Sequence, residues 1–214
     1  MEPRIPPVSL ADADDDTHEL LSRFSRLRGD DVEVLNVFGT IANHPALLRR
    51  WLVFATHVLA KSTLDPRTRE LVVLRVGWQC QAPYEWGQHV VVGRTVGLTD
   101  ADVARVAQGP DAAGWTPIEA ACLRATDELH ERSTITDETW AALRPHLTDE
   151  QLLDFVFLVG QYHLVSFALN ACGVVRDDGV DDTAVPFPAA AGGVRGRAGH
   201  DARRSADGTA SLVP

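Results

Sequence analysis

Apolar residues recur along the chain at the three- and four-residue spacing of helices. Three early segments show this pattern: a one-faced helix over 18–27, a short helix or turn over 34–41, and a well-buried helix over 46–59. The longest apolar run, LLDFVFLVGQYHLVSFALNACG, is apolar nearly all round and predicts a final helix that is central or at a subunit interface. No stretch alternates apolar and polar residues in the manner of a strand. The pattern therefore predicts a compact all-α protein with short connections.

Capping signals divide the apolar segments into separate helices. Asp65 and Pro66 form a helix start, and Pro83 ends that run and opens the next helix, which Gly97 terminates. Further starts are predicted at four threonines that precede apolar runs: Thr99, Thr116, Thr136 and Thr148.

The two ends of the chain differ in composition from this helical part. Residues 1–16 are rich in proline and aspartate and predict a flexible arm. From Asp177 onward the chain has few large apolar residues, so it lacks the buried surface that would offset chain entropy. We therefore expect one helical domain over 17–176 and a disordered tail over 177–214.

The composition is that of an ordinary globular protein. Of the 214 residues, 45% are apolar and 23% are charged, which is enough material for a core. The net charge of −10 provides no basic surface for nucleic acid. We identify no uninterrupted apolar run of membrane-spanning length, and the first residues lack the apolar segment of a secretory signal. These features predict a cytoplasmic protein without nucleic-acid or membrane partners.

The cysteines and acidic residues do not form a recognisable metal motif. Cys80, Cys122 and Cys172 are widely spaced in apolar stretches, which is typical of reduced, buried thiols and not of a disulfide framework or a zinc site. A di-iron bundle needs two Glu-x-x-His units, whereas Glu85 and His89 are four residues apart and have no second copy. The expectation is therefore a protein without metal or cofactor.

The segment 70–97 carries the residues best suited to chemistry. Glu70, Glu85 and His89 lie there in otherwise apolar surroundings, where each carboxylate must be paired, hydrogen-bonded or shifted in pKa. Glu85 and His89 share one helix face, and histidine titrates near neutrality. We predict an acid/base site in which one glutamate is ionised while the other glutamate, or His89, carries a proton. A structural ion pair between two helices fits the same spacing equally well.

Four segments together resemble the carboxymuconolactone decarboxylase-like family, which includes the alkylhydroperoxidase D-like (AhpD-like) enzymes. They lie within 36–175 and read LDPRTRELVVLRVGWQC, YEWGQHVVVGRTVGLTD, WTPIEAACLRATDELHE and LLDFVFLVGQYHLVSFALNACGV. Peroxidase members of that family carry a glutamate, then C-x-x-C, then a histidine. With Glu70 and His89 on the outer positions, Ala82 and Glu85 stand where the cysteines would be. The chain therefore resembles the decarboxylase branch, in which the YEW-x-x-H block is typical.

The resemblance implies an all-helical fold that assembles into trimers or hexamers. The apolar final helix agrees with this, because it is more apolar than the surface of a monomer tolerates. Five residues are expected at the substrate pocket: Cys80, Tyr84, Trp86, His163 and Asn170. Core packing is the alternative for Cys80 and Trp86, and hydrogen bonding to backbone is the alternative for His163.

We expect a cofactor-independent enzyme of the lyase or decarboxylase type. Its substrate would be a small carbonyl acid, a lactone or an intermediate of a tailoring pathway. The two glutamates and His89 would supply the acid/base chemistry, with His163 or Tyr84 stabilising an enolate oxygen. Two alternatives stay open: a thiol peroxidase that acts through Cys80, and a non-catalytic ligand-binding oligomer in which arginines neutralise the glutamates.

Overall fold

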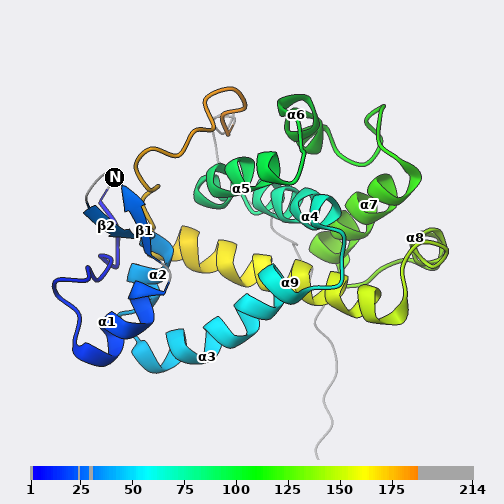
Figure 1. Cartoon of the computed structure of the whole chain (residues 1–214). Coiled ribbons are helices and arrows are strands. Elements are labelled where there is room, and N and C mark those ends of the chain that lie inside the picture. Colours follow the sequence, from blue (N-terminus) through cyan, green and yellow to red (C-terminus); the bar gives the residue numbers. More distant parts are fainter. Residues whose placement is uncertain (1, 24, 29–30, 188–214) are drawn as a thin grey trace, which may run out of the picture.

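The computed structural model describes residues 2–23, 25–28 and 31–187. Within them the first elements are α1 (Asp15–Ser22), β1 (Ser25–Arg28), β2 (Asp31–Val34), α2 (Asn36–Ile41), α3 (Pro45–Thr56) and a π-helical turn, η1 (His57–Lys61). They are followed by α4 (Pro66–Gln79), α5 (Pro83–Thr95), α6 (Asp100–Gln108), α7 (Pro117–Arg132), α8 (Asp137–Leu143) and α9 (Asp149–Cys172) (Figure 1). The all-α class is confirmed, with one short hairpin added to it.

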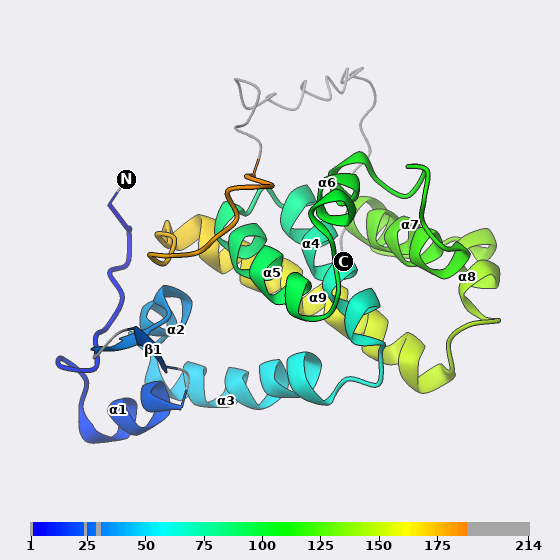
Figure 2. The same ribbon diagram turned by 45° about the horizontal axis from the view of Figure 1, so that its top comes forward.

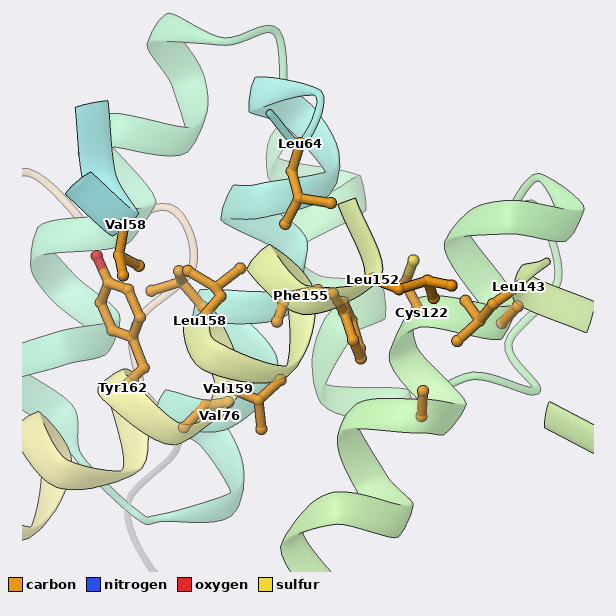
Figure 3. Close-up of a cluster of buried hydrophobic side chains, with 14 residues drawn as sticks. Val58, Leu64, Val76, Cys122, Leu143, Leu152, Phe155, Leu158, Val159 and Tyr162 are labelled. Carbon is orange, nitrogen blue, oxygen red and sulfur yellow. The ribbon is translucent and has the colours of Figure 1, made fainter. Parts of the chain in front are cut away.

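Helix α4 lies at the centre of the packing. It contacts α5, α7 and α9, and Figure 2 shows α9 running beside α4 and α5 through the middle of the molecule. The main hydrophobic cluster joins α4, α7 and α9 and includes Val76, Cys122, Phe155 and Leu158 (Figure 3). Because α4 is enclosed on three sides, any polar group on it must find its partners inside the protein.

The capping signals are confirmed at the helix starts that frame α4 and α5. The Asp65 carboxylate accepts a hydrogen bond from the Thr68 backbone N–H, and Pro66 and Pro83 are the first residues of their helices. Gly97 follows α5 with a φ of +88°, a left-handed conformation in which a β-carbon would be strained. These local signals set where the two helices begin and where α5 ends.

The helix predicted over 18–27 is wrong in its second half. Helix α1 ends at Ser22, and Ser25–Arg28 pairs antiparallel with Asp31–Val34. Pairing between the strands supplies the backbone hydrogen bonds that a longer helix would have made.

The segment 46–59 is less buried than predicted. Helix α3 buries only Leu48 and Leu52, while Leu47, Val53 and Phe54 are exposed. The α-helical pattern also ends at Thr56 and passes into the π-helical turn η1. Apolar residues on most faces therefore do not mark a core helix here, because only one side of α3 is buried.

Both ends of the chain are held more firmly than expected. The arm predicted over 1–16 is fixed by backbone hydrogen bonds from Arg4 and Ile5 to Cys172 and from Val8 to Gly39. The tail predicted from Asp177 is ordered as far as residue 187, because Asp177, Asp182 and Val185 are buried. The remaining tail, 188–214, lies outside the described residues.

One described helix, α9, is long and apolar enough to cross a membrane by length and composition alone. No run of that length was identified from the sequence. Half of the apolar window of α9 is buried inside the protein, and core helices of globular proteins pass the same test. This is weak support for a membrane span, and the expected absence of a membrane partner stays a prediction.

Two adjacent leucines of α3 provide a matched test of the packing. Leu48 is 0% exposed and Leu47 is 52% exposed. Leu48→Ala is expected to lower the free energy of unfolding by about 2–5 kcal/mol, because it removes buried contacts and leaves a cavity. Leu47→Ala should change it by less than about 0.5 kcal/mol. Urea denaturation checks both values, and equal effects would contradict this burial.

Candidate active site

A tight turn brings α4 and α5 together. Helix α4 ends at Gln79 and α5 begins at Pro83, so only three residues connect them. One of these, Gln81, has a φ of +51°, an uncommon conformation for a residue other than glycine. The turn folds α5 back onto α4, which places Glu70 in the middle of α4 opposite His89 on α5.

The three predicted acid/base residues form one connected group. His89 lies between the two carboxylates, with Nδ1 2.6 Å from Oε2 of Glu70 and Nε2 3.1 Å from Oε1 of Glu85. All three side chains are buried, and Glu70 is 0% exposed. A doubly protonated imidazole donates to both carboxylates at once, which is the arrangement these distances favour.

The charged side chains of this group stabilise one another, which allows them to remain ionised although they are buried. Burial alone would lower the pKa of His89, but the adjacent Glu70 and then Glu85 outweigh it and raise that pKa to about 10. Burial alone would raise the pKa of Glu70, yet His89 and Arg69 hold it below its usual value. At neutral pH the group therefore contains an imidazolium and an ionised Glu70.

Arg69 completes the balance of charge. Its Nε donates to Oε1 of Glu70 at 3.1 Å. No other hydrogen bond of the Arg69 side chain is found within the described part of the chain, so its terminal N–H groups are available to a ligand. Two cations, Arg69 and His89, thus face two carboxylates, and the network can accept one further anion at Arg69.

A cavity of about 310 Å³ opens beside this network. It is lined by residues from α2, α3 and η1 and by residues from α4, α5 and α9. The walls are mainly apolar, with eight polar side chains among them: Thr56, Arg69, Tyr84, Glu85, Gln88, His89, Gln161 and Tyr162. Such a cavity, apolar with a few converging polar groups, is typical of a small-molecule site.

Three polar atoms at this cavity lack a protein partner among the described residues. Oε1 of Gln161 and Nε1 of Trp51 are buried without a hydrogen bond. The Tyr162 hydroxyl likewise has no partner, and the ring of Tyr162 meets the His89 ring edge-on at 5.0 Å. Burial raises the pKa of Tyr162 well above its usual value, so it remains a donor. Buried polar groups left unpaired in this way are suited to a bound ligand.

Tyr84 lines the same cavity, but its hydroxyl is already used. It donates to Oδ2 of Asp177 at 2.5 Å and accepts from the Val37 backbone N–H at 3.2 Å. Asp177 also accepts from the Gln88 side chain and the Asn36 backbone N–H. Tyr84 therefore contributes its ring to the cavity wall, while Asp177 ties the start of α2 and the chain after α9 to α5.

The other predicted pocket residues do not line this cavity. Trp86 is packed in the core against Trp78 and Phe187, and its indole N–H donates to the Val185 carbonyl. Cys80, His163 and Asn170 lie outside the lining as well. Asn170 donates to the Cys80 carbonyl at 2.8 Å, so it supports the α4–α5 turn. Core packing, the alternative for Trp86, is what the structure shows.

Sequence reasoning missed several lining residues. Arg69, Trp51 and Gln88 line the cavity but carry no motif that singles them out in the sequence. Tyr162 is a polar residue in the strongly apolar final helix, and only the structure shows that it lines the cavity. A polar residue interrupting a strongly apolar helix was the available signal, and it applied to Gln161 and Tyr162 alike.

Comparison with known proteins agrees with this architecture. Residues 45–128 match the carboxymuconolactone decarboxylase family. No curated protein sequence matches the chain.

Solved structures show the same fold. An AhpD-core, peroxidase-related protein of Ralstonia eutropha JMP134 is 24% identical, with a TM-score of 0.72 over 82% of this chain and 93% of that one. A putative antioxidant defence protein AhpD of Agrobacterium tumefaciens is 18% identical, with a TM-score of 0.60 over 64% and 94% of the two chains. The debrominase Bmp8 in complex with 2,3,4-tribromopyrrole is 10% identical, with a TM-score of 0.62 over 83% and 94%. At these identities the likeness concerns the fold.

Glu70 is the residue that keeps His89 charged, and this can be tested by titration. In the wild-type protein, His89 should lose its proton only near pH 10. Glu70→Gln removes the largest favourable charge and leaves the effect of burial, so the pKa of His89 should fall. Nuclear magnetic resonance of the imidazole as a function of pH measures both values. Glu150→Gln, an exposed change on α9, serves as control, and an unchanged His89 pKa in Glu70→Gln would contradict the assignment.

Proposed function

We propose that the chain is an enzyme of acid/base chemistry, because residues 45–128 match the carboxymuconolactone decarboxylase family and solved AhpD-like proteins share its fold. Its substrate is a small carbonyl acid or lactone, and the reaction is of the lyase or decarboxylase type without a cofactor. One observation carries this proposal: the hydrogen-bonded group Glu70–His89–Glu85 forms part of the wall of an apolar cavity.

Each member of the group has a distinct part in the proposed reaction. Glu85 and His89 line the cavity, so they are the groups that reach a reacting carbon. Glu70 does not line it and is fully buried, so it acts as a positioning residue that orients His89 and keeps it protonated. Proton transfer by such a positioned pair contributes about 10²–10⁴-fold to a rate.

The proposed steps balance without an added reactant. The bond between the carboxylate carbon and the adjacent carbon breaks, carbon dioxide leaves, and the electron pair passes into an enolate. The Tyr162 hydroxyl donates a hydrogen bond to the enolate oxygen. Glu85 then delivers to the carbon a proton that it receives from Nε2 of His89, and solvent returns a proton to His89. In a lactone, the same groups move a proton at the carbon beside the carbonyl.

Arg69 accounts for the preference for an acid. Arg69 lines the cavity and its terminal N–H groups have no partner among the described residues, so its planar fork of donors suits a substrate carboxylate. The dry walls around it strengthen that attraction relative to water. Gln161 can accept a hydrogen bond from a hydroxyl of the same ligand, since its Oε1 is unpaired.

The two alternative functions are less well supported. Burial raises the pKa of the Cys80 thiol to about 11, which disfavours the reactive thiolate, and Cys80 lies outside the cavity. In a non-catalytic oligomer, arginines would neutralise both glutamates. Arg69 does pair with Glu70, but the cavity is open and Glu85 faces it.

Exchange of carbon-bound protons tests the proposed chemistry across a whole class of substrates. A panel of small β-keto acids, carboxylated lactones and their decarboxylated products is incubated with the protein in heavy water. Mass spectrometry then detects loss of carbon dioxide and deuterium next to the carbonyl. Glu85→Gln and His89→Asn are each expected to slow the active reaction by about 10²–10⁴-fold.

The control for this experiment is Glu138→Gln, an exposed change on α8 that does not line the cavity. It should keep the wild-type rate. Circular dichroism establishes that each variant is folded. Turnover that survives both Glu85→Gln and His89→Asn in folded protein would refute the acid/base scheme.

We also propose that the chain assembles with copies of itself, as trimers or hexamers. Four large apolar residues of α9 are exposed: Leu153, Phe157, Leu164 and Phe167. Their spacing places them along one side of the helix, opposite the side that packs in the core. An apolar stripe of this kind is typical of an interface between subunits.

Replacing two residues of this stripe should separate the subunits. The double variant Leu153→Glu and Leu164→Glu introduces charges that cannot be buried in the interface. Light scattering after size-exclusion chromatography is expected to give a trimer or hexamer for the wild type and a monomer for the variant. Trp140→Glu, an exposed change on α8, is the control. A monomeric wild-type protein would contradict the proposal.

A further inference from the structure

A second cluster of chemically capable side chains lies outside the cavity. Cys80 at the end of α4, His130 in the last turn of α7 and His163 on α9 each present a ligand atom, and these atoms lie within 4.8 Å of one another. The three residues come from three helices and are separated by 50 and 33 positions in the sequence. None of them lines the cavity of the proposed reaction.

The orientation of His163 is fixed for binding through one nitrogen. Its Nδ1 lies 2.8 Å from the Val159 carbonyl oxygen, so Nδ1 carries the proton and donates it there. The lone pair is then on Nε2, which lies 2.8 Å from Nδ1 of His130. A backbone carbonyl that accepts from the second ring nitrogen is the usual support of a metal-bound histidine.

His130 supplies the second nitrogen. Its side chain is exposed at the end of α7, and Nδ1 points at Nε2 of His163. Burial, and then the neighbouring His163, lower the pKa of His130 and favour the neutral ring that a metal requires. Asp127 and Glu131 raise the pKa of His130, whereas Arg75 lowers it, as His163 does.

Cys80 supplies the third ligand from a position that is well defined. The Cys80 carbonyl accepts a hydrogen bond from the Asn170 side chain, and the Cys80 backbone N–H donates to the Val76 carbonyl at the end of α4. Its thiol is half-buried and is not part of a disulfide. A thiolate with two imidazoles is a donor set that suits zinc and contains no oxygen for magnesium or calcium.

We propose that Cys80, His130 and His163 form a zinc site with three protein ligands and a fourth position open to water. Zinc binds nitrogen at about 2.0–2.1 Å and sulfur at about 2.3 Å, in tetrahedral geometry. The two facing nitrogens must move apart by a few tenths of an ångström, which rotation of the exposed His130 side chain permits. On binding, the thiol loses its proton to solvent and the ion joins the ends of α4 and α7 to α9.

No zinc site was predicted from the sequence, because its cysteines and histidines do not recur at the short spacing of a zinc motif. The three ligands here come together only through packing of α4, α7 and α9. The alternative to zinc is a direct hydrogen bond from Nδ1 of His130 to Nε2 of His163, with Cys80 packed beside it.

Cobalt and zinc binding to the purified full-length protein test the proposal. Co²⁺ should bind at one ion per chain and give the near-ultraviolet absorption of a cobalt–thiolate bond, and Zn²⁺ should displace it. Competition with a chromophoric chelator gives the zinc affinity. Cys80→Ser, His130→Asn and His163→Gln are each expected to weaken zinc binding by more than about 100-fold, beyond the loss typical of a supporting residue.

Matched controls are Cys172→Ser and His146→Asn, which should bind as the wild type does. Zinc should also raise the melting temperature of the wild-type protein but not that of Cys80→Ser, since it binds the folded state. A wild-type protein that binds no stoichiometric zinc, or binding that is indifferent to all three ligand variants, would overturn the proposal. These measurements do not involve turnover, so they are independent of the proposed reaction.

Discussion

The burial of a charged imidazole between two carboxylates is the constraint on which the site depends. An isolated ion in the position of His89 would lose several kcal/mol of hydration. Contacts of 2.6 Å to Glu70 and 3.1 Å to Glu85 offset that loss, and Arg69 balances the remaining negative charge. The three-residue turn after α4 makes these contacts possible, because it sets α5 against α4 in the correct register. The same contacts can serve catalysis, since they hold a proton donor and an acceptor in place in advance of a substrate.

Charged and apolar residues lie on different parts of the cavity wall. Its charged wall is formed by α4 and α5, while α2, α3 and η1 contribute mainly apolar surface. Apolar surroundings of this kind strengthen electrostatic interactions at the charged wall relative to water. The π-helical turn η1 is part of the lining through Val58 and Leu59, and π-helical turns are frequent at functional sites.

The chain after α9 has a larger structural part than its composition indicates. Asp177 receives hydrogen bonds from Tyr84, Gln88 and the first residue of α2, so it links the chain after α9 to two residues of the cavity wall and to α2. Farther along, Val185 and Phe187 complete an aromatic cluster around Trp86. The N-terminal residues are likewise held by a few backbone hydrogen bonds to α2 and α9. Few contacts therefore suffice to order segments of low hydrophobicity when the partner groups are already fixed.

The sequence by itself determined the helical class, most helix starts and the three residues of the buried group Glu70–His89–Glu85. These follow from local rules: Asp65 caps the helix it precedes, Pro83 opens the next, and Glu85 and His89 share a face at a spacing of four. The family resemblance could also be drawn from the sequence, because it rests on contiguous motifs. Capping residues, helical spacing and contiguous motifs involve residues close together in the chain, so they can be identified without knowing how the helices pack.

Tertiary structure alone decided which side chains share a space. The structure places Trp86 in the core and Gln161 in the cavity wall, and it brings Cys80 close to two histidines of other helices. These relations depend on how helices far apart in sequence pack. It also replaced the second half of a predicted helix by a hairpin, since pairing with residues later in the chain satisfied the same backbone groups. Helical periodicity defines the face of a residue but not the partner of that face, and the chemistry of this protein depends on the partners.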